Sequence, residues 1–107
     1  MATKKLKMLK AEIFIDADDL IGGQTLQEFI LHFIAKHKII GATVFRGRLG
    51  FGKNQLVQRP NDLFSFDETP VLITFIDETE KINTVLTELR KVWKGGFIIT
   101  QQVEAWN

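Results

Sequence analysis

The sequence has no cysteine, and only two prolines and two histidines occur among its 107 residues. Without cysteine it can form neither disulfides nor thiolate metal sites. Its net charge of +1 falls well short of the positive excess typical of nucleic-acid-binding proteins. No run approaches the roughly 18 apolar residues of a membrane span, and the N-terminal stretch lacks the apolar core and cleavage site of a signal peptide. We therefore expect a cytoplasmic protein that is not membrane-embedded and binds no nucleic acid.

Apolar side chains, in contrast, are plentiful. Hydrophobic residues make up 45% of the chain and include nine phenylalanines, while 25% of the residues are charged. This composition is typical of a folded domain with a real hydrophobic core and not of a disordered chain. The length suits one domain, which we expect to span residues 1–107.

Six segments with a regular pattern follow one another in the order strand, helix, strand, strand, helix, strand. Thr25 and Glu28 have the spacing of a capping box at the first helix start, and Gly41 is placed to break that helix. Gly95 and Gly96 are expected to stop the second helix. The segments are expected near residues 9–15, 25–38, 43–45, 71–76, 77–93 and 97–106. This order predicts an α+β fold, the ferredoxin-like βαββαβ sandwich, with two helices on one face of an antiparallel four-stranded sheet.

Such a sheet has one face without helices. Alternate residues of the apolar run 71–76 face the helices, so Leu72 and Ile76 must point the other way, together with Phe14. Leaving three large apolar side chains in water is unfavourable, and a patch of this kind usually marks an interface. We therefore predict an oligomer interface at Phe14, Leu72 and Ile76. The alternative is that the C-terminal tail, with Trp106, covers this face.

The glycine-rich segment at residues 41–53, "GATVFRGRLGFGK", excludes two phosphate-binding motifs. Its glycines are spaced G-x-x-G-x-G and follow a strand without opening a helix, unlike the dinucleotide fingerprint, and no G-K-[ST] of a Walker loop is present. The stretch at residues 48–53 also resembles a motif of RNA-binding RRM domains. That motif belongs on the third strand, whereas it lies here at the end of the second, so an RRM-like domain is a less favoured alternative.

Backbone N–H groups in this segment can form a nest for an anion, with basic side chains supplying positive charge. The nest would comprise Gly50, Phe51, Gly52 and Lys53, and the charge would come from Arg46, Arg48 or Lys53. The other interpretation is that the glycines only allow bulges and positive φ angles where the strand leaves the sheet. The spacing alone does not decide between the two.

Metal-binding and catalytic sites are not expected. Asp16, Asp18 and Asp19 resemble the start of a calcium loop, but Ile21 stands where that loop needs glycine. His32 and His37 have no further ligand at a suitable spacing. No Ser-His-Asp set or carboxylate pair can be argued from the remaining residues. We therefore expect no enzyme activity.

The string "GATVFRGRLGFG", together with the later "PVLITFIDETEKI", closely resembles an uncharacterised prokaryotic family of the PII-like superfamily. The resemblance extends from the first strand to the last. It implies a ferredoxin-like fold that usually assembles as a homotrimer around the open sheet faces.

PII signalling proteins have a similar stretch that lines a cleft between subunits and holds ATP or ADP. The matching positions here are Thr43, Gly50, Phe51 and Gly52. PII also grips the phosphates with a glycine- and lysine-containing loop before its last strand. The matching stretch is shortened here to Lys94, Gly95 and Gly96, without the second lysine. The resemblance implies an adenine nucleotide or another small anion as effector.

The resulting expectation is a regulatory module without enzyme activity. It would bind an anionic metabolite or nucleotide in clefts between subunits and act through residues 53–69 on a partner protein, such as a transporter or an enzyme. The main alternative is an oligomeric protein-interaction scaffold that binds no ligand.

Overall fold

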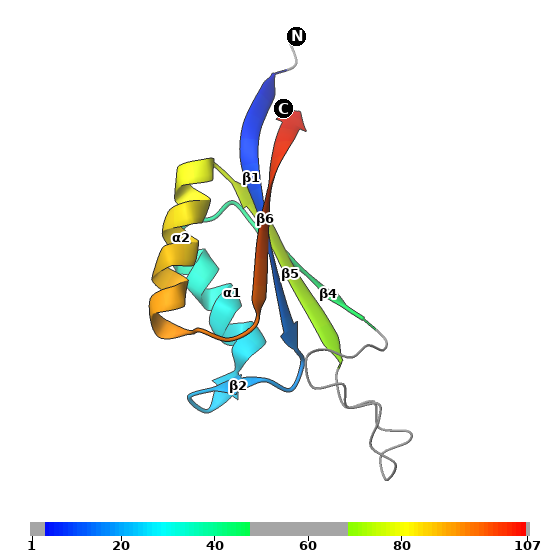
Figure 1. Ribbon diagram of the computed structural model, residues 1–107, viewed down its shortest axis with the longest axis vertical. Helices are drawn as coiled ribbons and strands as arrows, with labels where there is room; N and C mark the ends of the chain where they lie inside the picture. The colour runs from blue at the N-terminus through cyan, green and yellow to red at the C-terminus, as the bar shows by residue number, and fades with distance from the viewer. Residues whose placement is uncertain (1–3, 48–68, 107) are drawn as a thin grey trace.

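The computed structural model describes residues 4–47 and 69–106. Its main sheet has the strand order β4-β5-β1-β6 with antiparallel pairing throughout, and both helices cover one face (Figure 1). The predicted ferredoxin-like sandwich is therefore confirmed, with the first and third expected strands at its centre. The elements are β1 (Lys5–Asp16), β2 (Leu20–Ile21), β3 (Gln24–Thr25), α1 (Leu26–Lys36), β4 (Ala42–Arg46), β5 (Pro70–Asp77), α2 (Thr79–Val92) and β6 (Phe97–Trp106).

The core lies between the sheet and the two helices. Every second residue of β1 from Leu9 to Ile15, and of β5, points into it, as the alternation of apolar residues predicts. The helices add apolar stripes at helical spacing. The fully buried large side chains are Phe75, Ile13, Ile30, Ile73, Ile82, Leu89, Val71 and Val85.

Helix α1 begins with half of the predicted capping box. The Thr25 hydroxyl accepts a hydrogen bond from the Glu28 N–H, as expected, but the Glu28 carboxylate accepts from that hydroxyl and not from a backbone N–H. The helix ends at Lys36, and the chain then turns at Lys38, whose φ is 61°. Gly41 was expected to make this break, and that expectation is wrong because Lys38 takes the left-handed conformation.

Helix α2 starts beside a buried carboxylate. Asp77, at the end of β5, is only 3% exposed and accepts hydrogen bonds from the backbone N–H groups of Glu78 and Ile40 at 2.7 and 3.0 Å. Lys81 lies 3.4 Å from the same carboxylate and also donates to the Lys38 carbonyl. Asp77 therefore ties the start of α2 to the connection that leads from α1 into β4.

The other end of α2 differs from the prediction. The helix ends at Val92, and Trp93 is already extended, so Gly95 and Gly96 do not stop it. They shape the turn that follows.

Strands β1 and β6 continue together beyond the rest of the sheet. The last pair between β1 and β5 is Leu9 with Asp77, whereas β1 and β6 remain paired as far as Lys5 and Trp106 (Figure 1). Trp106 lies at the tip of this ribbon, 68% exposed. The tail therefore does not cover the open face of the sheet. Within residues 4–47 and 69–106, no helix is long and apolar enough to cross a membrane.

The polar connection after β1 contains a small hairpin that was not predicted. Strands β2 and β3 pair Leu20 with Thr25 and Ile21 with Gln24, around the turn at Gly22 and Gly23. Two-residue strands are too short for an alternation pattern to reveal them.

Candidate functional site

One row of apolar side chains crosses the open face of the sheet from edge to edge. The strand register places Phe45 opposite Leu72, Leu72 opposite Phe14, and Phe14 opposite Phe97. Directly paired residues of neighbouring strands project from the same face, so the four side chains form a continuous band. We call the residues Phe45, Leu72, Phe14 and Phe97 the apolar row.

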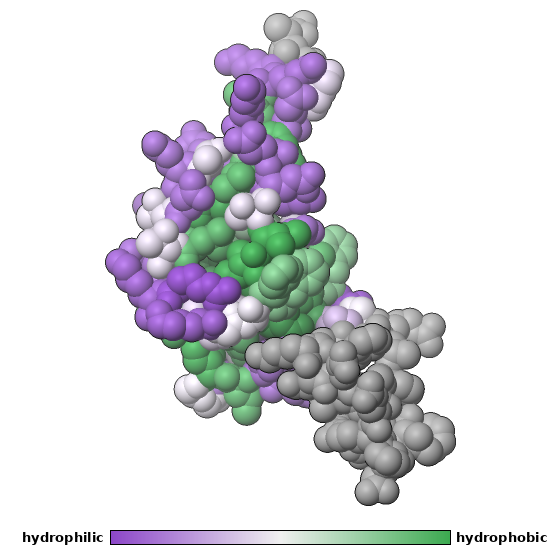
Figure 2. All heavy atoms as spheres, in the orientation of Figure 1, coloured by the Kyte–Doolittle hydropathy of each residue, from purple (hydrophilic) through white to green (hydrophobic). Residues whose placement is uncertain are grey.

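The apolar row is largely exposed in the single chain. Phe45 is 55% exposed, Phe14 40% and Phe97 64%, although the Phe14 and Phe97 rings lie 6.0 Å apart. Ile76 lies on the same face, farther along β5, and is also 40% exposed. Figure 2 shows a continuous apolar patch beside the sheet, between the hydrophilic outer side of the helices and the ribbon of β1 and β6. The predicted positions of Phe14, Leu72 and Ile76 on the uncovered face are confirmed.

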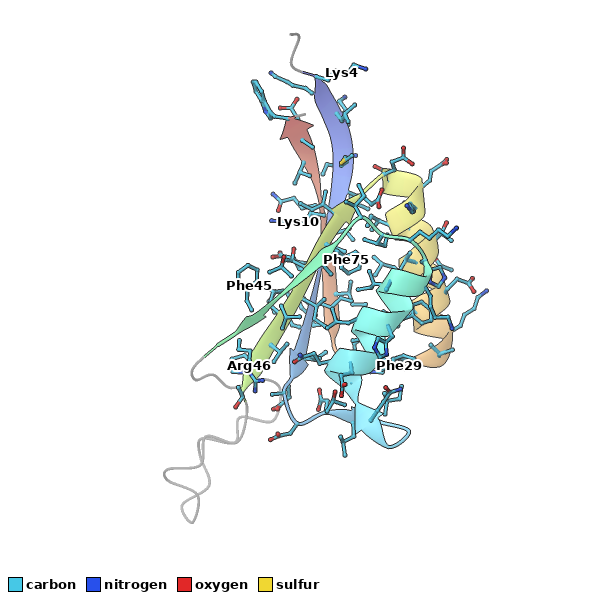
Figure 3. All side chains as sticks on the ribbon, turned by 180° about the vertical axis from the view of Figure 1, so that it is seen from behind. Lys4, Lys10, Phe29, Phe45, Arg46 and Phe75 are labelled. Carbon is cyan, nitrogen blue, oxygen red and sulfur yellow. The ribbon has the colours of Figure 1, made fainter. Side chains whose placement is uncertain are left out.

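A hollow lies at one end of the apolar row, where β4 and β5 meet. It measures about 270 Å³ and is lined by Phe14, Ile15, Phe45, Arg46, Gly47, Pro70, Val71 and Leu72. Its walls are mostly apolar, and Arg46 is the charged residue among the lining residues that the structure describes. Figure 3 shows Arg46 at the end of β4, and Phe45 on the side of the sheet away from the helices. Thr43 is exposed on the same face as Phe45 and lies opposite Thr74.

Gly47 directly follows β4 and makes a backbone hydrogen bond to the first residue of β5. Its N–H donates to the Pro70 carbonyl at 2.7 Å, and a Cβ at this position would lie only 2.6 Å from Pro70 Cγ. Glycine is needed here because the two chain segments approach each other so closely. The glycine therefore determines how the chain passes from β4 into residues 48–68.

The second predicted element, Lys94 to Gly96, forms a tight corner before β6. Arg90 donates hydrogen bonds to the carbonyls of Trp93 and Gly95, and its guanidinium lies 5.0 Å from the centre of the Trp93 ring. Gly96 has a φ of 67°, and a Cβ there would lie 2.4 Å from the Trp93 ring. The Lys94 ammonium donates to the Arg90 carbonyl at 2.8 Å. Lys94 therefore caps the end of α2 in this structure.

Arg90 and Trp93 were not among the predicted site residues. Arg90 lies on a helical face between stripe positions, and Trp93 is the last residue of the apolar stripe, so neither stands out in the sequence. Only the folded corner brings their side chains over the backbone of residues 94–96.

The two predicted elements lie at the same end of the sheet but at opposite edges. Arg46 ends β4, one edge strand, and the corner leads into Phe97 of β6, the other edge strand. Three strand spacings separate these edges, which amounts to roughly 14 Å. A single chain therefore does not bring Thr43 and Arg46 together with Lys94, Gly95 and Gly96.

The other predicted ligand residues lie outside the described residues. They are Arg48, Gly50, Phe51, Gly52 and Lys53. The segment 53–69, expected to contact a partner, also lies outside them except for Thr69.

The acidic connection after β1 stabilises its own turn. Asp19 accepts a hydrogen bond from the Asp16 N–H at 3.0 Å, and Asp16 accepts one from the Asp18 N–H at 2.9 Å. Within the part of the chain that the structure describes, no group of three His, Asp or Glu side chains is arranged to hold a metal ion.

Comparison with known proteins identifies the family. The model of the DUF190 family, described as "Uncharacterized ACR", matches residues 8–105. The chain belongs to the DUF190 family. A UPF0166 protein of Aquifex aeolicus is 34% identical over 105 residues, which cover 97% of this chain and 96% of that protein.

Solved structures of other proteins share the fold of this DUF190 chain. The apo form of CPII, a nitrogen regulatory PII-like protein from Thiomonas intermedia K12, matches with a TM-score of 0.69 at 14% identity, covering 99% of both chains. The same protein bound to ADP and bicarbonate matches with a TM-score of 0.68 at 14% identity, covering 95% of this chain and 91% of that one. The fold of this DUF190 protein is therefore PII-like.

Proposed function

We propose that this DUF190 protein is a regulatory module that assembles as a homotrimer and binds a small anionic ligand in clefts between its subunits. The observation that carries the proposal is the separation of the two predicted ligand elements across the sheet. They lie at the same end but roughly 14 Å apart, so only a neighbouring copy can bring one against the other.

The hollow at the end of β4 supports this proposal. At about 270 Å³ it is slightly smaller than most ligand pockets, so a second subunit is needed to enclose a molecule the size of a nucleotide. Its apolar walls suit a flat ring such as adenine, and the Arg46 guanidinium suits a phosphate or carboxylate. The preformed corner at residues 94–96 of the neighbouring chain would close the cleft from the other side. The resemblance of the fold to CPII, which has been solved with ADP, AMP and bicarbonate, favours the same ligand classes.

The proposed action of the module is on another protein. The segment that leaves the sheet at Gly47 and returns at Pro70 starts beside the hollow, so a ligand there would contact the base of that segment. Residues 48–53 would complete the ligand site, and residues 53–69 would contact the partner, such as a transporter or an enzyme. Binding would act through a shift of populations between two states of the module, without a chemical reaction.

Calorimetry tests the ligand proposal. The protein is titrated with ATP, ADP, AMP and bicarbonate, first as the native chain and then with Arg46→Met. We expect Arg46→Met to weaken binding about tenfold or more, since a hydrogen bond to a charged group contributes about 1.5–3 kcal/mol. Lys91→Met is the matched control, because Lys91 lies on the outer side of α2 and should not affect binding. If the native chain binds none of these ligands, the protein is better described as a ligand-free scaffold.

Mixing two variants tests whether the cleft lies between subunits. Arg46→Met removes the charge on one side of the cleft, and Gly95→Glu places a repelling carboxylate on the other. Each variant alone should lose affinity for the anionic ligand. A mixed assembly of the two should regain some binding, because some clefts then combine the unaltered side of each chain. Failure of the mixture to regain binding, with mixed assemblies formed, would place the site within one chain.

A further inference from the structure

Two opposite charges lie beside the apolar row on β1, one of the two central strands of the sheet. Glu12 and Lys10 precede Phe14 by two and four residues along β1 and project from the same face. Figure 3 shows Lys10 on the side of the sheet away from the helices. Steps of two residues along a strand measure about 6.6–6.8 Å, so a subunit that covers Phe14 must also approach Glu12 and Lys10.

The residues paired with Lys10 and Glu12 on the neighbouring strands carry no opposite charge. Lys10 lies between Ile76 of β5 and Gln101 of β6 in the strand register. Glu12 lies between Thr74 and Ile99 in the same way. Among residues 4–47 and 69–106, the salt bridges found involve neither Lys10 nor Glu12. Both side chains are already half-buried in the single chain.

Burial of this face would therefore be costly without a matching surface. A charge that is buried without an opposite charge or a hydrogen-bond partner destabilises an interface strongly, whereas a charge pair determines how two surfaces align. Further copies of the same face offer the required match, since in a closed trimer the Lys10 of each copy can meet Glu12 of one neighbour while its Glu12 meets Lys10 of the other. The open face is thus complementary in charge to other copies of itself, and it also carries the apolar row.

We propose that Lys10 and Glu12 form ion pairs between copies of this chain, and that these pairs set the alignment in which the open sheet faces associate. This inference rests on the proposed homo-oligomer. The apolar row supplies most of the area buried on association, which favours contact without specifying the alignment. The two charges exclude alignments that place Lys10 against Lys10 or Glu12 against Glu12. They thereby hold each hollow at the end of β4 against the corner at residues 94–96 of the neighbour.

Charge reversal tests the proposal. Native protein, Lys10→Glu, Glu12→Lys and the double variant Lys10→Glu/Glu12→Lys are compared by light scattering and analytical ultracentrifugation over a range of concentrations. Each single variant should raise the dissociation constant of the assembly tenfold or more, because like charges then face each other. The double variant should restore assembly, because it exchanges the two charges and keeps the complementarity.

A mixture of the two single variants separates pairing between chains from pairing within one chain. Lys10→Glu has negative charges at both positions 10 and 12, and Glu12→Lys has positive charges at both. At the same total concentration the mixture should assemble more than either variant alone. The defect of each single variant should also shrink with added salt, as the Debye length falls from about 10 Å at 0.1 M to about 3 Å at 1 M.

Two control variants show whether a defect in assembly comes from the interface or only from altered folding or net charge. Lys36→Glu makes the same charge change as Lys10→Glu on the exposed last turn of α1, and Glu80→Lys makes the same change as Glu12→Lys on the exposed first turn of α2. Both controls should assemble like the native chain, and circular dichroism should show every variant folded.

Two outcomes would overturn the proposal, and they are distinguishable. If the native chain assembles and the single reversals assemble equally well, the ion pairs do not exist, while the proposed oligomer stands. If the native chain is a monomer at high micromolar concentration, the proposed oligomer fails and the ion pairs fail with it.

Discussion

Replacing Asp77 by alanine should destabilise the fold more than any other single change of a polar residue described above. The carboxylate is 3% exposed and accepts hydrogen bonds from Ile40 N–H and Glu78 N–H, with Lys81 at 3.4 Å. Alanine leaves two backbone N–H groups without an acceptor at the junction of β5 and α2. It also removes the partner of the Lys81 ammonium.

The expected magnitude follows from these contacts. Leaving a buried donor unsatisfied costs about 1–3 kcal/mol, and the contacts share one carboxylate, so their effects do not simply add. We expect Asp77→Ala to lower the free energy of unfolding by about 3–4 kcal/mol. Asp77→Asn keeps one acceptor oxygen and should lower it by about 1–2 kcal/mol.

Urea denaturation followed by circular dichroism measures both variants, at one chain concentration because assembly shifts apparent stability. Glu80→Ala is the control, since this exposed carboxylate in the first turn of α2 forms no salt bridge among the described residues and interacts with the helix dipole, worth about 0.3–1 kcal/mol. A loss below about 1 kcal/mol for Asp77→Ala would contradict the reasoning, because it would mean that water or a rearranged side chain replaces the carboxylate without cost.

The pH dependence of the same measurement gives an independent check. Burial raises the pKa of Asp77, but the hydrogen bonds from Glu78 and Ile40 and the charge of Lys81 outweigh it and hold that pKa below its ordinary value of 3.8. The ionised carboxylate therefore contributes stability that is fully present above pH 3.8 and is lost as the pH falls through the lower, folded-state pKa. The difference in stability between the native chain and Asp77→Asn should stay constant from pH 7 to 5 and shrink below pH 3.8. A difference that grows on acidification would contradict this sign.

Two further predictions concern the site. Gly47→Ala should lower the free energy of unfolding by about 1–3 kcal/mol, because its Cβ would lie 2.6 Å from Pro70 Cγ. Gly41→Ala is the control, because a Cβ at Gly41 meets no atom within 4 Å. In the same urea titration it should change the free energy of unfolding by less than about 0.5 kcal/mol. Arg90→Met should speed amide hydrogen exchange around Gly95 and weaken ligand binding, while changing the overall melting temperature little, since the guanidinium holds only the corner. Unchanged exchange at the corner would show that the Trp93 ring alone is enough to hold it.

Much of the architecture could be predicted from local pattern. The alternation in β1 and β5 and the apolar stripes of the helices have different periods, and each period matches its element. The positions of Phe14, Leu72 and Ile76 on the open face follow from that alternation alone. The turn after α1 could not be predicted, because the carbonyl of the left-handed Lys38 accepts a hydrogen bond from Lys81 of α2, which is distant in sequence.

Less of the candidate site than of the fold could be predicted from the sequence. The sequence by itself determined which residue types are present: a glycine segment with nearby cations, a shortened corner before the last strand and a resemblance to the PII-like proteins. Only the tertiary structure decided that these elements lie at opposite edges of one sheet, that Lys94 caps α2, and that Phe45 and Phe97 extend one apolar row across all four strands. The physical reason is that strand order and register depend on how the helices and strands pack together, whereas composition and periodicity report only on each segment and its immediate neighbours.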